Sequence, residues 1–311
     1  MLSFSYTSDL QLRGTLSTVD RLRTTILSLP ISVKSEIKLQ WESMATRIWA
    51  TLALADYDVP RLHIATILAH PTKPTAAVNL IFAQRSVYDF IHTNWRANPK
   101  PINIATFETI FDLLYTKKRQ QFSKVETSLK ELLDYLSAQE EHPVIQAAIA
   151  HIHILTLPDL PDAGLLARAA HYLYLSKYGY DLRGYVYPEK LWFSDKATYR
   201  HIADMYTHEH SLNPWLSYMA ETAETNLESI TTDIQESRFH IEFPASFWEL
   251  NDRQKELLKS MDSPDATITT KKAQKHFKTS QITASRDLTK LASLGLLYPH
   301  GKGRSIYYTK I

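Results

Sequence analysis

The chain has 311 residues, of which 44% are apolar and 22% charged, and this size and composition are typical of a globular protein with two or three domains. It contains no cysteine, which excludes disulfides, thiol catalysis and thiolate metal sites. The first residues lack a basic segment followed by an apolar core, and no apolar stretch reaches the roughly 20 residues that span a bilayer. The 7 glycines are few for this length and favour helices over sheets. We therefore expect a helical, cytoplasmic protein without a membrane partner.

The charge is unevenly distributed along the chain. Residues 251–311 contain 12 Lys or Arg and 5 Asp or Glu, whereas residues 1–250 contain 23 Lys or Arg and 28 Asp or Glu. The C-terminal segment is therefore basic, although the net charge of the whole chain is only +2. A basic segment of this kind is a candidate for contact with nucleic acid. Lysines on solvated helix faces are the alternative explanation.

The first half of the chain reads as helices joined by short loops. Residues 69–75 include two prolines and form a loop, after which Val78 and Asn79 open a helix. The segment 116–132 has neither glycine nor proline and also reads as helix. Residues 142–156 form an apolar helix, on which His151 and His153 point to different faces and so do not share a metal site.

A loop at residues 157–168 leads into a helix that runs to Lys177. We expect Asp162 to be the N-cap of this helix, because a short acidic side chain fills that position well. Arg168 either binds an anion or makes a surface contact with a neighbour one turn away. His208 and His210 are expected on the surface.

The next helix is the clearest of the chain. Its start is marked by Asn213 as N-cap and Pro214 at the first helical position. Its apolar stripe has helical spacing, with glutamates off the stripe, and consists of Leu216, Met219, Ala220, Ala223, Leu227, Ile230 and Ile234.

Residues 239–247 break the helical period and read as a linker to a compact C-terminal module. Asn251 caps a first helix with Leu257 and Leu258 on its apolar side, and 269–277 and 280–294 form two more helices. A strand pair at 295–298 and 306–308 surrounds the turn at 300–304. This order resembles a winged helix-turn-helix with a small β-hairpin wing.

A winged helix-turn-helix contacts DNA through the N-terminal side chains of its recognition helix and the basic residues of its wing. The positions that we expect to meet DNA are Thr279, Ser280, Gln281, Thr283, Ala284, Ser285, Arg286, Lys302 and Arg304. The alternative is a module used for dimerisation or intramolecular docking, in which Ser280 is only an N-cap and Arg286 pairs with Asp287 or solvent.

Residues 142–168 resemble the helix and signature loop of Fic-domain proteins, enzymes that transfer AMP and whose loop reads H-P-F-x-D-G-N-G-R-x-x-R. The resemblance implies a His as general base, an Asp that holds magnesium, a glycine-rich helix start around the phosphates, and arginines on the ATP phosphates. Here the signature is degenerate. Pro158 stands at the position of the His, Leu160 at that of the Phe, and Asp162 at that of the Asp. The Gly-Asn-Gly-Arg run is replaced by Ala163, Gly164, Leu165 and Leu166, and Arg168 matches the second Arg if one residue has been lost.

Two further departures accompany the degenerate loop. Many Fic proteins carry an inhibitory helix with S-S-x-I-E-G, whose Glu pairs with a loop arginine; residues 45–50 resemble it, and Trp49 stands at the Glu position. Active relatives also carry a β-hairpin flap that clamps the target peptide, where this chain has the predicted helix 116–132. The resemblance thus implies the loss of the base, the inhibitory acid and the clamp.

The resemblance extends over nearly the whole chain. Residues 211–216 are similar to the D-L-T-P-W-L that opens a late Fic helix, and 283–288 match the T-A-S-R-D-L of recognition helices attached to Fic proteins. We expect an all-α, Fic-like protein with a C-terminal winged helix-turn-helix, divided into an N-terminal helical region at 1–110, a Fic-like core at 111–238 and the winged module at 247–311.

The resulting hypothesis is a Fic-like pseudoenzyme that binds DNA or protein as a regulator. It has no catalytic residues, metal or cofactor, and its partner is DNA, with a homodimer or a second Fic protein as further partners. The alternative from the enzyme class is an active or residual protein AMP transferase, in which ATP and magnesium bind and Asp162 is the metal ligand.

Overall fold

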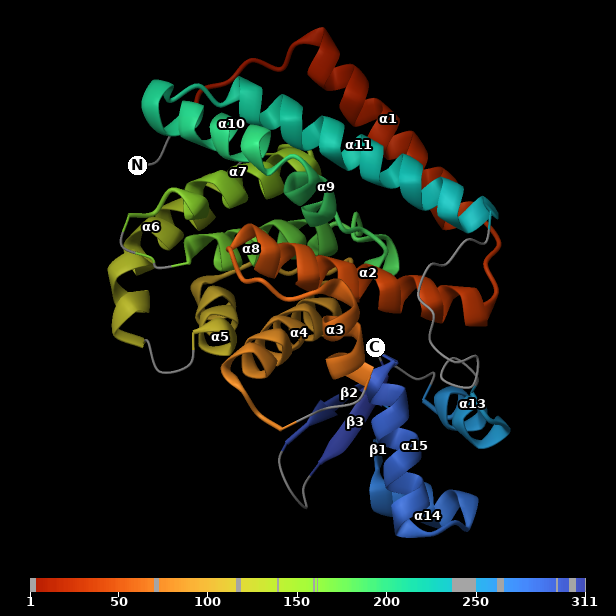
Figure 1. Cartoon of the computed structure of the whole chain (residues 1–311). Coiled ribbons are helices and arrows are strands. Elements are labelled where there is room, and N and C mark those ends of the chain that lie inside the picture. Colours follow the sequence, from red (N-terminus) through yellow and green to blue (C-terminus); the bar gives the residue numbers. More distant parts are fainter. Residues whose placement is uncertain are drawn as a thin grey trace.

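The computed structural model describes residues 4–69, 73–115, 119–138, 140–158, 160, 162–236, 250–261, 266–294, 296–301 and 306–310. It consists of a large helical region and a smaller C-terminal module (Figure 1). The predicted linker at 239–247 lies outside the described residues. None of the helices in the described residues is long and apolar enough to cross a bilayer.

The helical region contains eleven described α-helices and one 3-10 turn. Their bounds are α1 (Leu10–Ser28), α2 (Val33–Leu54), α3 (Arg61–Ala69), α4 (Ala76–Trp95), α5 (Ile104–Leu114), α6 (Arg119–Ala138), α7 (Pro143–Leu155), α8 (Ala163–Lys177), η1 (Leu182–Gly184), α9 (Glu189–Ser194), α10 (Lys196–Glu209) and α11 (Asn213–Glu236). The segment predicted as helix at 116–132 is α6 over its described part.

The helix pair α7 and α8 forms the centre of this region. Almost every residue of both helices is buried, as expected for helices that are apolar on all faces. The helix α7 begins at Pro143, and the side chain of His142 accepts a hydrogen bond from the backbone N–H of Val144. Short side chains such as Ala147 and Ala170 are fully buried and let the two helices approach closely.

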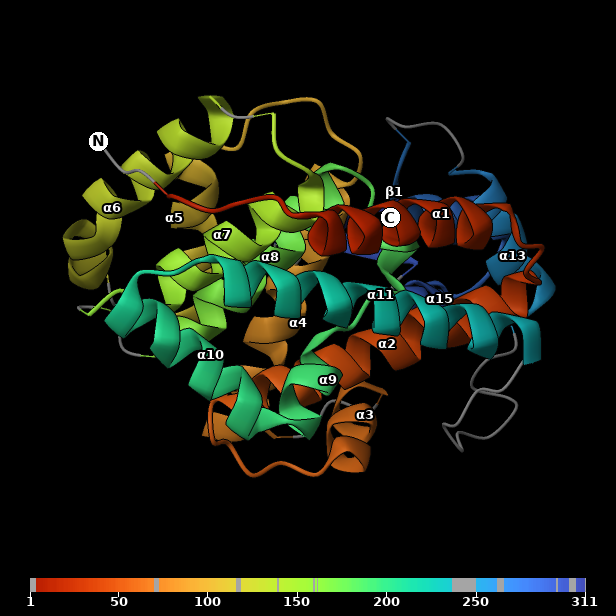
Figure 2. The same ribbon diagram turned by 90° about the horizontal axis from the view of Figure 1, so that it is seen from above.

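The helices α1 and α11 pack side by side and cover one face of the central pair (Figures 1 and 2). The predicted stripe of α11 is buried except for Ala223, which is partly buried, and α1 contributes residues such as Leu12 and Val19 at helical spacing. Asn213 does not cap α11 as predicted, because its side-chain amide is used elsewhere: it accepts from the Thr7 N–H at 3.1 Å and donates to the Thr7 carbonyl oxygen at 2.7 Å. The polar start of α11 thus fixes the segment that precedes α1.

The C-terminal module has its own small core. It comprises α13 (Asp252–Lys259), β1 (Thr267–Thr269), α14 (Thr270–Phe277), α15 (Gln281–Ser293), β2 (Leu297–His300) and β3 (Tyr307–Lys310). The three strands form an antiparallel sheet in the order β1-β3-β2, with Ile268 opposite Tyr308 and Tyr308 opposite Pro299. The predicted caps are present: Asn251 forms a capping box with Gln254, and Ser280 accepts from the Thr283 N–H.

The module contacts the helical region through the C-terminal end of α15. Arg85 on α4 donates from Nη2 to the Ala292 carbonyl oxygen at 2.9 Å and from Nε to Asp89 Oδ2 at 2.6 Å. Leu294, the C-cap of α15, is buried in the core of the helical region rather than in that of the module. The other end of α15, together with α14, lies on the side of the module away from the helical region (Figure 1).

Candidate functional site

The segment that was compared with the Fic signature loop joins α7 to α8 and continues into the first two turns of α8. Pro158 is exposed, whereas Leu160 is buried. Leu165 and Leu166, in the first turn of α8, are both buried in the core. These two leucines therefore do not border an open cradle at the helix start, and they fill apolar space instead.

Asp162 stands at the N-cap position of α8 but does not cap it. Its backbone is left-handed, with φ 52°, and its side chain accepts no hydrogen bond from the first turn. The prediction of a capping aspartate was therefore wrong, because the left-handed backbone turns the carboxylate away from the helix N–H groups. The Asp162 side chain is exposed, and its backbone carbonyl oxygen accepts from the Tyr115 hydroxyl at 2.9 Å.

Arg168 is buried, so the predicted surface contact was wrong, while the alternative of an anion-binding arginine stays a prediction. Only 2% of its surface is exposed, and Nη2 donates to the Thr51 carbonyl oxygen on α2 at 3.1 Å. Its guanidinium lies over Gly164, where an added Cβ would stand 2.8 Å from Nη1. The arginine thus lies beside the first turn of α8 and fills the space next to Gly164.

The segment resembling an inhibitory helix is part of α2. Trp49 is partly buried and meets Phe193 of α9 edge to face, with ring centroids 5.0 Å apart. The helix α2 nevertheless contacts the loop arginine through the Thr51 carbonyl, two residues after Trp49. A backbone acceptor on α2 therefore binds Arg168 without an acidic side chain.

A buried group of charged and aromatic residues lies next to Arg168, and the sequence analysis missed it. Glu189 is fully buried at the start of α9, and burial raises its pKa to about 7 despite the nearby charges of Arg47 and Arg168. Neither carboxylate oxygen of Glu189 accepts a hydrogen bond from another side chain in the described part of the chain. A buried carboxyl group with so few donors is best accommodated in its neutral form.

Arg47 is the second buried arginine of this group. Its guanidinium lies over the Tyr172 ring, 3.9 Å from the centroid, and donates to the carbonyl oxygens of Val186 and Gly184. Aromatic faces and carbonyl oxygens together accommodate this charge, with which no carboxylate of the described residues forms an ion pair. The only sequence signal for this arrangement is a charged residue within an otherwise apolar run of α2.

Two buried histidines complete the group. Nε2 of His151 lies 2.9 Å from the Tyr199 hydroxyl, and burial lowers the pKa of His151 well below its usual value. Burial also lowers the pKa of His171 to about 4. Both imidazoles are therefore neutral near pH 7, and they pack around Trp192.

His153 points to a different side of α7, with Nε2 near the Ser128 carbonyl oxygen, and His208 and His210 are exposed. Among the residues that the structure describes, no three His, Asp or Glu side chains converge in a way that could hold a metal ion. The described loop therefore presents one exposed carboxylate, that of Asp162, and no cluster of ligands around it.

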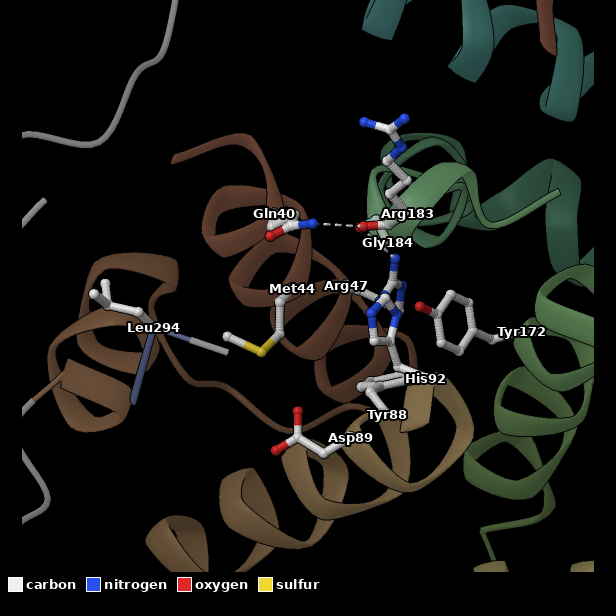
Figure 3. Close-up of a pocket in the computed structure, with 10 residues that line it drawn as sticks. All are labelled: Gln40, Met44, Arg47, Tyr88, Asp89, His92, Tyr172, Arg183, Gly184 and Leu294. Carbon is white, nitrogen blue, oxygen red and sulfur yellow. Dashed lines mark hydrogen bonds between the residues drawn. The ribbon is translucent and has the colours of Figure 1, made fainter. Parts of the chain in front are cut away.

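A pocket of about 50 Å³ lies where the module meets the helical region (Figure 3). It is lined by Gln40, Met44, Arg47, Tyr88, Asp89, His92, Tyr172, Arg183, Gly184 and Leu294. Gln40 donates to the Arg183 carbonyl oxygen at 3.1 Å, and the Arg183 side chain points out of the pocket. This volume suits one or two waters rather than an organic ligand.

The positions predicted to meet DNA cluster at the start of α15. Ser280, Gln281 and Arg286 are exposed, whereas Thr279, Thr283 and Ser285 are partly exposed. Ala284 was wrongly placed among them: it is buried in the core of the module. Lys302 and Arg304 lie outside the described residues.

Arg286 does not pair with the neighbouring Asp287. The Asp287 carboxylate instead accepts from Arg253 Nε at 2.5 Å and from Gln254 Nε2 at 2.7 Å, which joins α15 to α13. The hydrogen bonds from Arg253 and Gln254 hold the pKa of Asp287 below its usual value although burial opposes them. The exposed surface also includes Ile282, whose side chain is 65% exposed between polar neighbours.

The fold is similar to that of a Fic family protein from Desulfovibrio desulfuricans G20, known from a crystal structure at 2.70 Å resolution. The TM-score is 0.63 at 12% sequence identity, and the alignment covers 100% of this chain and 98% of that chain. No protein-family model matches the sequence, and neither does any curated protein. The chain therefore has a Fic-like, mostly helical fold, with a small three-stranded antiparallel sheet at its C-terminal end.

Proposed function

We propose that this Fic-fold protein has lost adenylyl transfer and regulates by binding duplex DNA through its C-terminal module, which we interpret as a winged helix-turn-helix. The observation that carries the proposal is the polar, exposed start of α15, at the end opposite the one that Arg85 and Leu294 attach to the helical region. A recognition helix needs this arrangement, since its first residues must enter the major groove.

The surface at the start of α15 also has suitable chemistry. Gln281 and Arg286 offer hydrogen-bond donors for base edges, and the exposed Ile282 offers an apolar surface for a thymine methyl group. The segment from residue 251 onward carries 12 basic against 5 acidic residues, which favours approach to phosphate. Lys302 and Arg304 are the wing residues proposed to contact the backbone.

Loss of transfer is supported by the side chains around the loop. Pro158 cannot accept a proton, and the two leucines of the first turn of α8 are buried. Arg168 is fixed beneath the helix start by Gly164 and the Thr51 carbonyl oxygen. These residues do not fit a magnesium–triphosphate group, because apolar and already bonded side chains stand where phosphate ligands are needed.

DNA binding is tested by anisotropy titration of the full chain with labelled genomic fragments at two salt concentrations. We expect association that weakens as salt rises, because phosphate contacts release counterions. An absence of salt-dependent association would overturn the DNA-binding proposal. The basic surface would then be assigned to docking on a protein, either the acidic remainder of the chain or a second copy.

The alternative is a residual AMP transferase, and the exposed Asp162 carboxylate is the observation in its favour. It is tested by titrating ATP and magnesium into the purified chain and by offering ATP labelled in its AMP part, with magnesium, to the chain and to lysate, where transfer would release pyrophosphate and leave the label on protein. We expect no transfer, and none after Pro158→His, since the phosphate cradle would still be lacking. Labelling that is present in the wild type and lost in Asp162→Ala would contradict the pseudoenzyme proposal.

A further inference from the structure

The helical region contains a pocket of about 220 Å³ that is remote from the degenerate loop. It lies between the segment after α4, the second half of α6 and the C-terminal end of α8. Its lining residues are Pro99, Pro101, Ile102, Leu133, Leu136, Ser137, Gln146, Tyr174, Lys177 and Tyr178. On α8, Lys177 of this pocket lies nine residues after Arg168, so about 14 Å of helix separates the two side chains along the axis.

The pocket has an open rim and a closed floor. Pro99, Pro101 and Ser137 are exposed, whereas Leu136 and Tyr174 are buried. The buried floor also includes Gln146, whose Oε1 accepts from the Tyr178 hydroxyl at 3.0 Å. A ligand can therefore enter from solvent and place an apolar body against the leucines and the tyrosine ring.

Lys177 supplies the charge of the pocket. Its ammonium group donates to the carbonyl oxygens of Asn98 and Lys100, which accounts for two of its three N–H groups. Burial lowers the pKa of Lys177, and no charged group offsets this effect. Its ammonium also lies 5.3 Å from the centroid of the Tyr178 ring. No carboxylate within the described residues forms an ion pair with it, so one N–H group and the net charge remain for a ligand.

We propose that this pocket binds a small organic carboxylate with an aryl or short alkyl body, and that Lys177 binds the carboxylate. The volume is sufficient, since a cavity of about 150 Å³ in an engineered protein holds benzene. The sign of the charge selects the ligand: a partly desolvated ammonium without a counter-ion is stabilised by an anion and destabilised by a second cation. The floor selects an apolar body.

A purely structural role for Lys177 is the competing explanation, because its two carbonyl contacts also hold the segment 98–100 against α8. The two explanations differ in one respect. A structural lysine gives no preference among small aromatic molecules of different charge, whereas a binding site prefers the anion.

The test uses the purified full chain and three matched probes, namely phenylacetate, 2-phenylethanol and 2-phenylethylamine, in calorimetric and saturation-transfer titrations. We expect saturable binding of phenylacetate, binding of the alcohol that is at least about tenfold weaker, and none of the amine, because a hydrogen bond to a charged group contributes about one to two orders of magnitude in affinity. Hexanoate is expected to bind like phenylacetate.

Three variants locate the site. Lys177→Met should reduce phenylacetate binding at least about tenfold, and Ser137→Trp should block it by filling the rim while leaving the lysine in place. Lys124→Met, which removes an exposed charge from α6, should leave binding unchanged. Equal binding of anion and amine, no binding of any carboxylate at millimolar concentration, or binding that survives Ser137→Trp would each overturn the proposal.

Discussion

Arg168 donates a hydrogen bond of 3.1 Å to the carbonyl oxygen of Thr51, a residue 117 positions earlier in the chain. In the Fic proteins that this loop resembles, an acidic side chain on the inhibitory helix pairs with a loop arginine. Here the acceptor is the backbone of α2 itself, and the Trp49 side chain packs on Phe193 instead. Arg168 is therefore held by a backbone carbonyl oxygen of α2 and not by an acidic side chain of that helix.

Gly164→Ala should destabilise the protein by about 1–3 kcal/mol, because its Cβ would force the Arg168 guanidinium away from Thr51. In an Arg168→Met background the same change should become neutral or favourable. Gly14→Ala on α1 is the control: nothing lies within 4 Å of its new Cβ, so we expect a gain of about 0.5–1 kcal/mol. Urea unfolding measures all three, and equal effects at the two glycines would contradict the explanation.

Glu189→Gln should change how stability depends on pH. Since burial raises the folded pKa of Glu189 from 4.5 to about 7, the folded chain keeps a proton that the unfolded chain has lost, and stability falls as pH rises through this interval. The free energy of unfolding of the wild type, minus that of Glu189→Gln, should fall by about 1.4 kcal/mol per pH unit between the two values.

His171 has the opposite effect, because its pKa is lowered to about 4 and protonation favours the unfolded chain as pH falls below 6.5. His151, with its lowered pKa, acts in the same direction. Both histidines are present in wild type and variant, so the difference isolates Glu189. A difference that stays flat over pH would mean that Glu189 is ionised in the folded state.

Arg286→Ala should weaken DNA binding by about 1–3 kcal/mol and relax sequence preference, if the side chain makes a bidentate contact with a base. Lys302→Ala or Arg304→Ala should weaken binding to all sequences alike and lower the salt slope by about 1. Arg21→Ala, which removes an exposed charge from α1, serves as the control in the same anisotropy titrations. Identical losses in all four variants would indicate a net-charge effect without a defined DNA surface.

Arg85→Met should loosen the attachment of the module, because the side chain joins α4 to the Ala292 carbonyl oxygen. We expect faster hydrogen exchange in the last turn of α15 and little change in DNA affinity, since the start of α15 makes the proposed DNA contacts. The control is Arg200→Met, which breaks an exposed pair with Asp56 on another face. Unchanged exchange in α15 would show that Leu294 alone holds the module.

The elements that the sequence predicted are those with a local cause. The stripe of α11 and the caps at Asn251 and Ser280 depend on residues within a few turns, and the structure contains all three. The strand β1 was missed because three residues are too short to show a period, and it exists as the partner of β3.

The candidate site was predicted less well, because its properties depend on residues far apart in the chain. Burial of Arg168 requires the Thr51 carbonyl oxygen from α2 and the missing side chain at Gly164. The pKa of Glu189 is raised because other helices cover α9 and bury the carboxyl group. The spacing of nearby residues does not indicate such contacts. For the same reason Asn213 was predicted to be a helix cap, although its side chain bonds to Thr7.

The pairing of α1 with α11 has a consequence for how the chain folds during synthesis. Leu12 and Val19 are buried only when the helix at 213–236 is present, and Thr7 is tied to Asn213 across 206 positions. The helix α1 is translated well before α11 and must therefore wait, with its apolar face uncovered, until the chain has been made as far as residue 236. Contacts of such sequence separation slow folding and prolong exposure to chaperones and proteases. A truncation within α11 would accordingly release α1 from the helical region, in addition to disrupting the C-terminal part of that region.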